Sequence, residues 1–296
     1  MKTFSGLGVA MVTPFNSAGK IDFPSLQRLT SRLINDGADY LVVQGTTGES
    51  PTLSIEEKRA LLDFILEVNS GKKPVVYGLG GNYTESIVRE IQEMDFKGID
   101  GILSVSPYYN RPTQEGIYAH YKAISESTDL PIILYNVPGR TASNMSAKTT
   151  LRLATDFKNI VAMKEASGDL NQISEIIANR PSGFLVLSGD DALALPSIAL
   201  GADGVISVVG NAFPREFSQM VHQALFGQFT EARKIHFQLR ELINLLFVEG
   251  NPAGIKEVLH HLRVCESYCR LPLLPVSPET SKLIYRQMAE HELVKV

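Results

Sequence analysis

The sequence predicts an α/β fold, a (β/α)8 TIM barrel with a C-terminal helical appendage. Eight short apolar or β-branched runs, each bounded by Gly, Pro, Asn or Asp, alternate with segments of helical periodicity. The runs are apolar almost throughout, which is typical of parallel strands covered by helices on both faces. From about residue 214 the strand pattern stops, and only amphipathic helical segments follow.

The predicted strands occupy residues 7–12, 40–44, 74–79, 101–105, 131–137, 160–166, 184–188 and 204–209. The helices between them carry N-terminal signals: Phe23-Pro24 leads into the first, and Ser54 with Glu57 forms a capping box. Later helices are expected to start near Thr84, Thr113, Ser146 and Asp169. The rival fold, a doubly wound open sheet, favours a G-x-G-x-x-G turn after its first strand, which here ends in Thr13-Pro14. Eight units therefore favour a closed barrel.

The chain is divided into a catalytic barrel, residues 1–226, and a C-terminal helical domain, residues 227–296. The late helices are expected at 216–226, 230–247, 252–262 and 278–290, with Pro252 at a first helical position. Cys265 and Cys269, the only cysteines, are four apart in a stretch taken as helical, so their thiols should share one helix face. Two cysteines do not form a disulfide framework, and a reducing cytoplasm fits.

Composition excludes several classes of protein. The chain has 296 residues, 44% hydrophobic and 20% charged, and a formal net charge of −4 with scattered basic residues. We therefore expect no nucleic-acid or anionic-membrane partner. No run of 18 apolar residues predicts a membrane span, and the N-terminal apolar run is too short for a signal peptide.

Lys164 lies near the C-terminal end of the sixth predicted strand, in the sequence I-V-A-M-K-E-A. Burial in an apolar slot disfavours an ammonium ion, and a neutral amine can form a Schiff base with a carbonyl substrate. Alternatively, the side chain extends to solvent or pairs with Glu165. Barrel enzymes place their chemistry at these strand ends.

The strand ends together contain tyrosines, threonines, an arginine and this lysine, but no histidine. Metal sites and Ser-His-Asp relays usually need a histidine, so we expect no metal. Asp190-Asp191 is the one acidic pair, and Asp191 is interpreted as a helix cap. The histidines all fall in predicted helices: His120, His222, His236, His260, His261 and His291.

The turn at 45–48, G-T-T-G, could present backbone N–H groups and two hydroxyls to an anion. It lacks the Walker spacing, and the acidic pair after strand 7 disfavours phosphate there. A carboxylate substrate is preferred, the alternative being a turn whose threonines cap the next helix. Tyr135 and Ile133 share one strand face, as do Ile160, Ala162 and Lys164. If both faces point inward, Tyr135 and Lys164 meet in one pocket, where a phenol can shuttle protons.

Three motifs in order resemble the dihydrodipicolinate synthase family of pyruvate-dependent class I aldolases. They are G-T-T-G-E-S at 45–50, Y-N-V-P-G-R-T at 135–141 and K-E-A-S-G at 164–168, and the resemblance extends to R-L-P-L at 270–273. It implies condensation of pyruvate with aspartate 4-semialdehyde in lysine and diaminopimelate biosynthesis, without a cofactor.

The resemblance also implies roles for single residues. Lys164 would form the Schiff base, and Thr46 and Thr47 would hold the pyruvate carboxylate. Tyr135, Thr46 and Tyr109 would form a proton relay, with Tyr109 reaching into a neighbouring subunit, so that a homodimer, commonly doubled to a tetramer, is expected. Arg140 would bind the semialdehyde carboxylate, a bidentate task. Ile206 would offer its backbone carbonyl near the lysine.

Lysine-inhibited members of this family have an effector cleft between subunits, whose residues Ser50, Asn82 and Tyr108 are matched here. Ile55 and Lys58 replace histidines, and Ser86 replaces the acid that meets the effector's amino group. A cationic Lys58 and a missing carboxylate disfavour a cationic effector unless Glu85 substitutes, so weak or absent lysine inhibition is expected.

Other functions remain open at this point. N-acetylneuraminate lyase and 2-keto-3-deoxy sugar acid aldolases resemble the chain in the lysine, the tyrosine and the turn, whereas Arg140 favours a second carboxylate. A non-catalytic barrel that binds a small acid would have no use for a buried amine. A phosphosugar isomerase would need a base beside a phosphate site.

Overall fold

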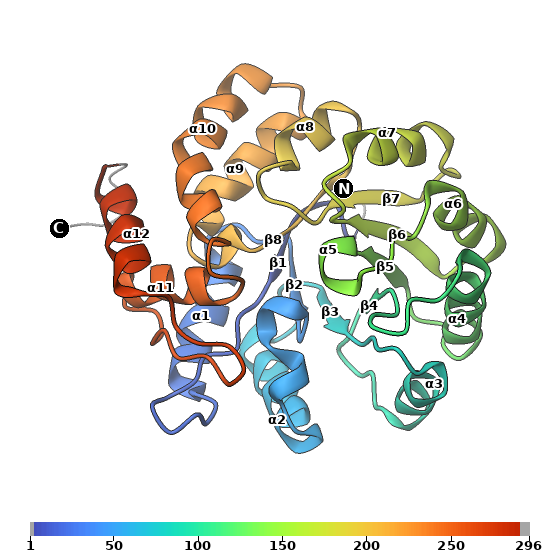
Figure 1. Cartoon of the computed structure of the whole chain (residues 1–296), viewed down its shortest axis with the longest axis horizontal. Coiled ribbons are helices and arrows are strands. Elements are labelled where there is room, and N and C mark those ends of the chain that lie inside the picture. The colour runs from blue at the N-terminus through green and yellow to red at the C-terminus, as the bar shows by residue number, and fades with distance from the viewer. Residues whose placement is uncertain (1–2, 291–296) are drawn as a thin grey trace.

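The structure, a computed structural model, describes residues 3–290 and contains a closed barrel of eight parallel strands in the order β1 to β8 (Figure 1). The predicted fold class is confirmed. Seven of the eight strands are shorter than the apolar runs that predicted them, because those runs include residues that enter and leave the barrel, and the fourth strand has the predicted bounds. Their bounds are β1 Gly6–Ala10, β2 Tyr40–Val43, β3 Val75–Gly78, β4 Gly101–Val105, β5 Ile132–Asn136, β6 Ile160–Glu165, β7 Leu185–Ser188 and β8 Gly204–Ser207.

Helices surround the strands on the outside of the barrel (Figure 1). They are α1 Phe23–Asn35, α2 Ile55–Asn69, α3 Thr84–Glu93, α4 Gln114–Glu126, α6 Ala147–Asp156, α7 Leu170–Asn179, α8 Ala194–Ala199 and α9 Pro214–Leu225. Short elements that the sequence did not predict follow several strands: η1 Thr46–Gly48, η2 Ser50–Thr52, α5 Pro138–Thr141 and η3 Val209–Asn211.

Most predicted helix starts are confirmed by their capping bonds. Ser54 and Glu57 form the capping box, and the side chains of Thr113, Ser146 and Asp169 accept backbone N–H groups at the N-caps of α4, α6 and α7. Thr84 is the first residue of α3.

The helical segment after residue 226 consists of α10 Phe229–Leu245, α11 Ala253–His261 and α12 Pro278–Glu290. Pro252 is the N-cap of α11 and not its first residue, and the Asn251–Pro252 peptide bond is cis. The strand-free character predicted for this part is seen in all its described residues.

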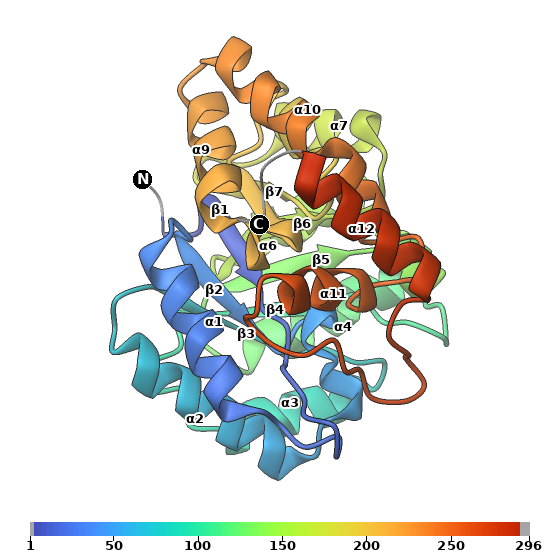
Figure 2. The same cartoon turned by 90° about the vertical axis from the view of Figure 1, so that its left-hand side faces the viewer.

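Cys265 and Cys269 do not lie on a helix, so the prediction of a shared helix face is wrong. Arg263 adopts a left-handed conformation with φ of 57°, and the Val264 N–H bonds back to the Leu259 carbonyl. This hydrogen bond closes the end of α11. The chain then runs as an irregular segment against α1 and α2, and both thiols are free (Figures 1 and 2).

Two apolar clusters form the core. The inner cluster fills the barrel with residues that include Ile133, Tyr135 and Ala162, while the outer cluster lies between strands and helices. Ile160 belongs to the outer cluster, so the predicted common face of Ile160 and Ala162 is wrong. The register between β5 and β6 shifts here, because Ile132 pairs with Ile160 but Ile133 pairs with Ala162. A bulge of this kind turns a side chain to the other face of the sheet.

No helix within residues 3–290 has the length and apolar character needed to cross a membrane. Within the same range, no three His, Cys, Asp or Glu side chains are grouped as they would be to hold a metal ion. The five histidines from His120 to His261 lie on helices as predicted, and His291 lies outside the described residues.

Candidate active site

A cavity of about 380 Å³ opens where strands β2 to β5 end and the segment after α11 passes by. Thr46, Tyr135 and Arg140, three of the predicted site residues, line it together with Asn251 and Leu273. Tyr135 lies near the end of β5, whereas Thr46 and Arg140 lie in the short elements that follow β2 and β5. This is the location expected for residues at a barrel mouth. Asn251 and Leu273 come from the C-terminal segment, so the helical appendage forms part of the cavity wall.

Lys164 and Tyr135 are register partners on neighbouring strands β6 and β5. The Lys164 Nζ lies 4.1 Å from the centroid of the Tyr135 ring, and the lysine is 6% exposed. Lys164 is not itself among the residues that line the cavity, but Tyr135, against which it packs, is. The structure thus places a buried amine behind a phenol at the cavity wall. The two side chains are neighbours as predicted, but only Tyr135 lines the cavity.

Gly189 leaves the space that the lysine stem occupies. A Cβ added at Gly189 would lie 2.6 Å from the Ala166 Cβ and 3.1 Å from the Lys164 Cε. Gly189 follows β7 directly, and no sequence motif assigns it a role. A glycine is required here for steric reasons. The requirement arises only once β6 and β7 are paired, so the sequence alone does not reveal it.

Glu165 does not pair with Lys164, so that alternative is excluded. Its carboxylate lies on the other face of β6, where it accepts hydrogen bonds from Asn136 Nδ2 at 3.0 Å, Gln172 Nε2 at 2.8 Å and the Ser167 N–H at 2.7 Å. Burial raises the pKa of Glu165, and these hydrogen bonds oppose the rise. Asn136 and Glu165 are also register partners, so this bond ties the two strands next to Tyr135 and Lys164.

Thr46 and Thr47 lie in η1, the turn that follows β2. Thr47 is buried, and its Oγ1 accepts a hydrogen bond of 3.0 Å from Asn251 Nδ2. Thr13 Oγ1, from the loop after β1, donates to the Gly48 carbonyl at 2.7 Å. Thr47 is not among the cavity-lining residues, whereas Thr46 is. The two threonines are therefore positioned differently with respect to the cavity.

Arg140 lies on the short helix α5 directly after β5, and it is exposed. Its Nη2 donates to the Asn251 carbonyl at 3.5 Å. A guanidinium on a short turn at the cavity edge can meet a carboxylate through two parallel hydrogen bonds. Asn251 contacts both Arg140 and Thr47, and no sequence motif indicates this role.

Ile206 and Tyr109 are not brought to the cavity wall. Ile206 is 1% exposed in the inner cluster on β8, below the mouth. Tyr109 is 88% exposed and has a φ of 72°, a strained conformation for a residue with a side chain. Strain of this kind persists only where surrounding contacts fix it, and it is frequent at functional sites.

Asp191 is not a helix cap, which corrects the sequence interpretation. Its Oδ2 accepts hydrogen bonds from the backbone N–H groups of Val208 and Val209, at 3.0 and 2.7 Å. Burial raises its pKa to about 6. The carboxylate thus holds the turn after β8.

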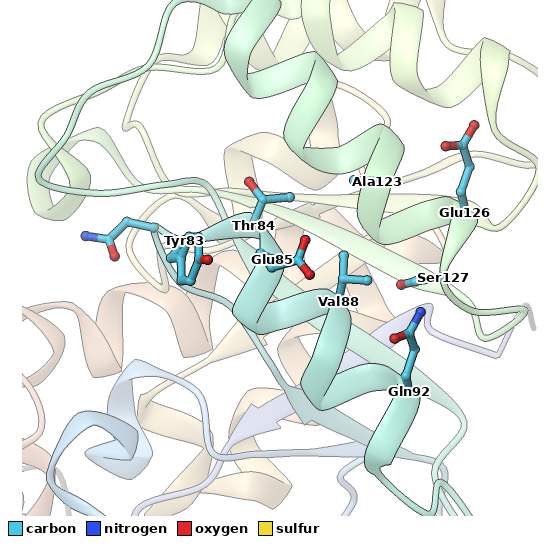
Figure 3. A pocket seen from close by; sticks show the side chains of 9 residues that line it. Tyr83, Thr84, Glu85, Val88, Gln92, Ala123, Glu126 and Ser127 are labelled. Carbon is cyan, nitrogen blue, oxygen red and sulfur yellow. The ribbon is translucent and has the colours of Figure 1, made fainter.

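The three residues matched to the effector cleft are divided between two hollows. Ser50 and Tyr108 line the 380 Å³ cavity, whereas Asn82 lines a more open hollow of about 550 Å³ between α3 and α4. Asn82 is still joined to Tyr108, since its Nδ2 donates to the Tyr108 carbonyl at 3.1 Å. Glu85 lines the open hollow (Figure 3), which Asn82 also lines.

Comparison with known proteins identifies the family of the chain. Residues 3–290 match the model of the dihydrodipicolinate synthetase family. The 4-hydroxy-tetrahydrodipicolinate synthase of Parabacteroides distasonis is 52% identical over 287 residues, which cover 96% of this chain and 97% of that protein. The crystal structure of dihydrodipicolinate synthase from Thermotoga maritima superposes with a TM-score of 0.96 at 42% identity, over 99% of this chain and 100% of that one.

A structure described as a monomeric dihydrodipicolinate synthase variant superposes equally well, with a TM-score of 0.96 at 41% identity over 99% of this chain and 98% of that one. The agreement extends over the barrel and the C-terminal helices alike. The chain belongs to the dihydrodipicolinate synthetase family.

Proposed function

We propose that this chain condenses pyruvate with L-aspartate 4-semialdehyde to give 4-hydroxy-tetrahydrodipicolinate, in lysine and diaminopimelate biosynthesis. The observation that carries the proposal is the buried Lys164 amine packed 4.1 Å from the Tyr135 ring at the barrel mouth. Relatives that cover nearly the whole chain bear the name of this activity.

The reaction proceeds through a Schiff base on Lys164. The neutral amine attacks the pyruvate ketone, and loss of water gives an imine. Loss of a methyl proton converts the imine to an enamine, whose carbon attacks the semialdehyde carbonyl. The amino group that came from the semialdehyde then attacks the imine carbon, which closes the ring and releases Lys164. The protonated imine is the electron sink, so the chemistry uses no cofactor.

The other site residues supply binding and proton transfer. Thr46 and Thr47 bind the pyruvate carboxylate, and the Tyr135 hydroxyl moves protons during formation and breakdown of the imine. Arg140, which lines the same cavity, binds the carboxylate of the semialdehyde. The Ile206 carbonyl accepts a hydrogen bond near the Lys164 amine.

We infer that the working enzyme is a homodimer, with a dimer of dimers as its larger form. Tyr109 is exposed and strained in the single chain, which supports a role in completing the proton relay of a second subunit. Trans-complementation tests this. Tyr109→Phe and Lys164→Ala chains are each expected to have low activity alone. Expressed together, they form mixed dimers in which one site has both an intact Lys164 and a partner's intact Tyr109. Failure of the mixture to regain activity would contradict the shared site.

Lysine inhibition is expected to be weak or absent. Lys58 and Ser86 stand where lysine-inhibited members carry a histidine and an acid, which disfavours a cationic effector unless Glu85 substitutes. An inhibition constant for L-lysine below about 1 mM would contradict this. The free thiols Cys265 and Cys269 are consistent with a cytoplasmic enzyme.

A substrate comparison tests the proposed reaction. The purified chain is assayed with pyruvate and aspartate semialdehyde, and in parallel for cleavage of sialic acid and of 2-keto-3-deoxy sugar acids. Turnover with the semialdehyde alone is expected, because Arg140 provides a carboxylate site and not a set of hydroxyl-binding groups. Preferred cleavage of a sugar acid would replace the proposal with an aldolase of the related class.

A further inference from the structure

Glu49 is the last residue of the G-T-T-G-E turn, and its carboxylate has no role in the proposed reaction. Glu49 is 2% exposed, and its Oε1 lies 2.5 Å from the Nζ of Lys256, a residue of α11. Both side chains of this ion pair have no exposed surface. The Glu49 Oε2 accepts a second hydrogen bond, of 2.9 Å, from the Arg270 backbone N–H. Both partners come from the C-terminal segment, more than 200 residues away.

The lysine in this pair is also fully satisfied. Lys256 Nζ donates to the Tyr268 carbonyl at 2.8 Å and lies 4.3 Å from the centroid of the Phe15 ring. The Arg270 guanidinium covers the same ring at 4.5 Å. These contacts connect the turn, the loop after β1 and the C-terminal segment in one buried cluster.

Arg270 extends this cluster to the other end of the turn. Its Nη1 donates to the Thr52 carbonyl at 2.7 Å, and the guanidinium bonds both oxygens of Glu57 at 2.7 and 2.5 Å. Its Nε donates to the Gly19 carbonyl at 2.8 Å. Residues 49–57, which follow the threonines, are thus anchored at Glu49, Thr52 and Glu57 by the same C-terminal segment.

The backbone conformation around residues 45–48 is unfavourable, so contacts from outside the turn are needed to stabilise it. Gln44 and Glu49, which flank it, both have left-handed conformations, with φ of 60° and 53°. These cost free energy in residues with side chains and persist only when the surroundings fix them. No side-chain capping bond stabilises η1 or η2. Inside the turn, the contact of Asn251 with Thr47 adds a further bond from the C-terminal segment.

We propose that Lys256 and Glu49 are positioning residues that hold Thr46 and Thr47 in place to bind the pyruvate carboxylate. The inference rests on the proposed function of the two threonines. The C-terminal helical segment then sets the affinity for the first substrate. The hydrogen bond of Arg140, which binds the second one, goes to the Asn251 carbonyl and not to the pair.

A buried ion pair could instead serve stability alone, and the variants must separate the two roles. Removing one partner leaves the other charge buried and unpaired, which destabilises the protein regardless of function. The double variant Glu49→Gln with Lys256→Met leaves no unpaired charge and keeps the approximate volumes. Glu49→Asp keeps both charges but shortens the link by one methylene group, so that the turn must shift to keep the pair.

The readout is the pyruvate concentration that half-saturates borohydride trapping on Lys164, together with the KM for each substrate. In the double variant and in Glu49→Asp we expect the half-saturating pyruvate concentration and the KM for pyruvate to rise about tenfold, since small displacements of binding groups have large effects. The KM for the semialdehyde should change less than about twofold, and trapping at saturating pyruvate should remain complete. Melting temperatures are recorded for each variant.

Lys234→Met is the matched control, because Lys234 forms an exposed ion pair with Glu231 on α10 in the same C-terminal segment. It should leave both KM values unchanged. A folded double variant or Glu49→Asp variant with the wild-type KM for pyruvate would overturn the inference and leave the pair a structural one. An equal rise in both KM values would also overturn it. Failure of the proposed function looks different: wild-type protein would then give no adduct on Lys164 at any pyruvate concentration.

Discussion

On the β5–β6 side of the barrel mouth, Tyr135 and Lys164 stand on two paired strands. On the β2 side, the turn that is proposed to bind a carboxylate has an irregular backbone, which contacts from the C-terminal segment hold in place. Tyr135 and Lys164 are register partners, and the bond between Asn136 and Glu165 on the opposite face ties the same two strands. Thr47 and Glu49 are held by Asn251 and Lys256, which are 204 and 207 positions distant. The positions of Tyr135 and Lys164 thus follow from strand pairing, whereas the conformation of the turn depends on contacts with residues far along the chain.

The largest expected effect tests the strand side. Lys164→Ala should lower kcat/KM by at least about 10⁴-fold, because no other group replaces a covalent nucleophile. Lys158→Met, at an exposed lysine just before β6, is the control and should retain wild-type turnover. Substantial activity in Lys164→Ala would mean that the strand pair is not the chemical centre.

Tyr135→Phe should have the next largest effect. It keeps the ring that packs against the lysine but removes the hydroxyl, and loss of a general acid–base group typically costs about 10²- to 10⁴-fold in rate. Stopped-flow measurement of imine formation should show the defect in the first half-reaction. A rate of imine formation equal to that of the wild type would remove the phenol from the proton relay.

Gly189→Ala disturbs the strand side of the barrel mouth but leaves the Lys164 amine and the Tyr135 hydroxyl chemically unchanged. The added methyl would meet the Ala166 Cβ and the Lys164 Cε, so the lysine stem must shift. We expect kcat to fall about tenfold or more, given how steeply rates depend on alignment. Gly139→Ala, where an added Cβ meets nothing within 4 Å, is the control. Unchanged kcat in Gly189→Ala would show that the amine tolerates displacement.

Lowering the pH is expected to change the stability contributions of Glu57 and Glu165 in opposite directions. The hydrogen bond from Arg270 lowers the pKa of Glu57, beside the turn, to about 2, whereas burial raises the pKa of Glu165 on the strand side. Stability from Glu57 is therefore present above about pH 4.5 and is lost as the pH falls toward 2. The contribution of Glu165 has the opposite sign: it is present at low pH and is lost as the pH rises through its raised pKa.

Urea denaturation at several pH values measures this difference. Glu57→Gln should lower the free energy of unfolding by about 1 kcal/mol at pH 7, after allowance for solvent screening of the partly exposed pair, and by less at pH 3. Glu165→Gln should cost more at pH 4 than at pH 7. The same pH trend in both variants would contradict the assignment of opposite shifts.

The same contrast explains which parts of the molecule could be predicted from the sequence. The period of two along β5 places Tyr135 and Ile133 on one face, and the apolar runs place the eight strands. The bulge that separates Ile160 from Ala162 could not be predicted, because it depends on how β6 pairs with β5. The short helices after β2 and β5 also escaped prediction, since they are only three or four residues long.

On the turn side, the motif at 45–50 located Thr46 and Thr47 but not what holds them. Asn251 and Lys256 carry no local signal of their contacts with Thr47 and Glu49, because contacts across more than 200 residues depend on the completed fold. The non-helical path of Cys265 and Cys269 has the same origin: Arg263 ends α11, and Arg270 then fixes the segment against Glu57 and Glu49.

Borohydride reduction in the presence of pyruvate tests the central claim most directly. The wild-type protein is incubated with pyruvate, reduced, digested, and analysed by peptide mass spectrometry. The account predicts one reduced pyruvate adduct, on Lys164, dependent on both pyruvate and borohydride. A protein that turns over its substrates yet carries no adduct on Lys164, or carries it on another lysine, would contradict the account.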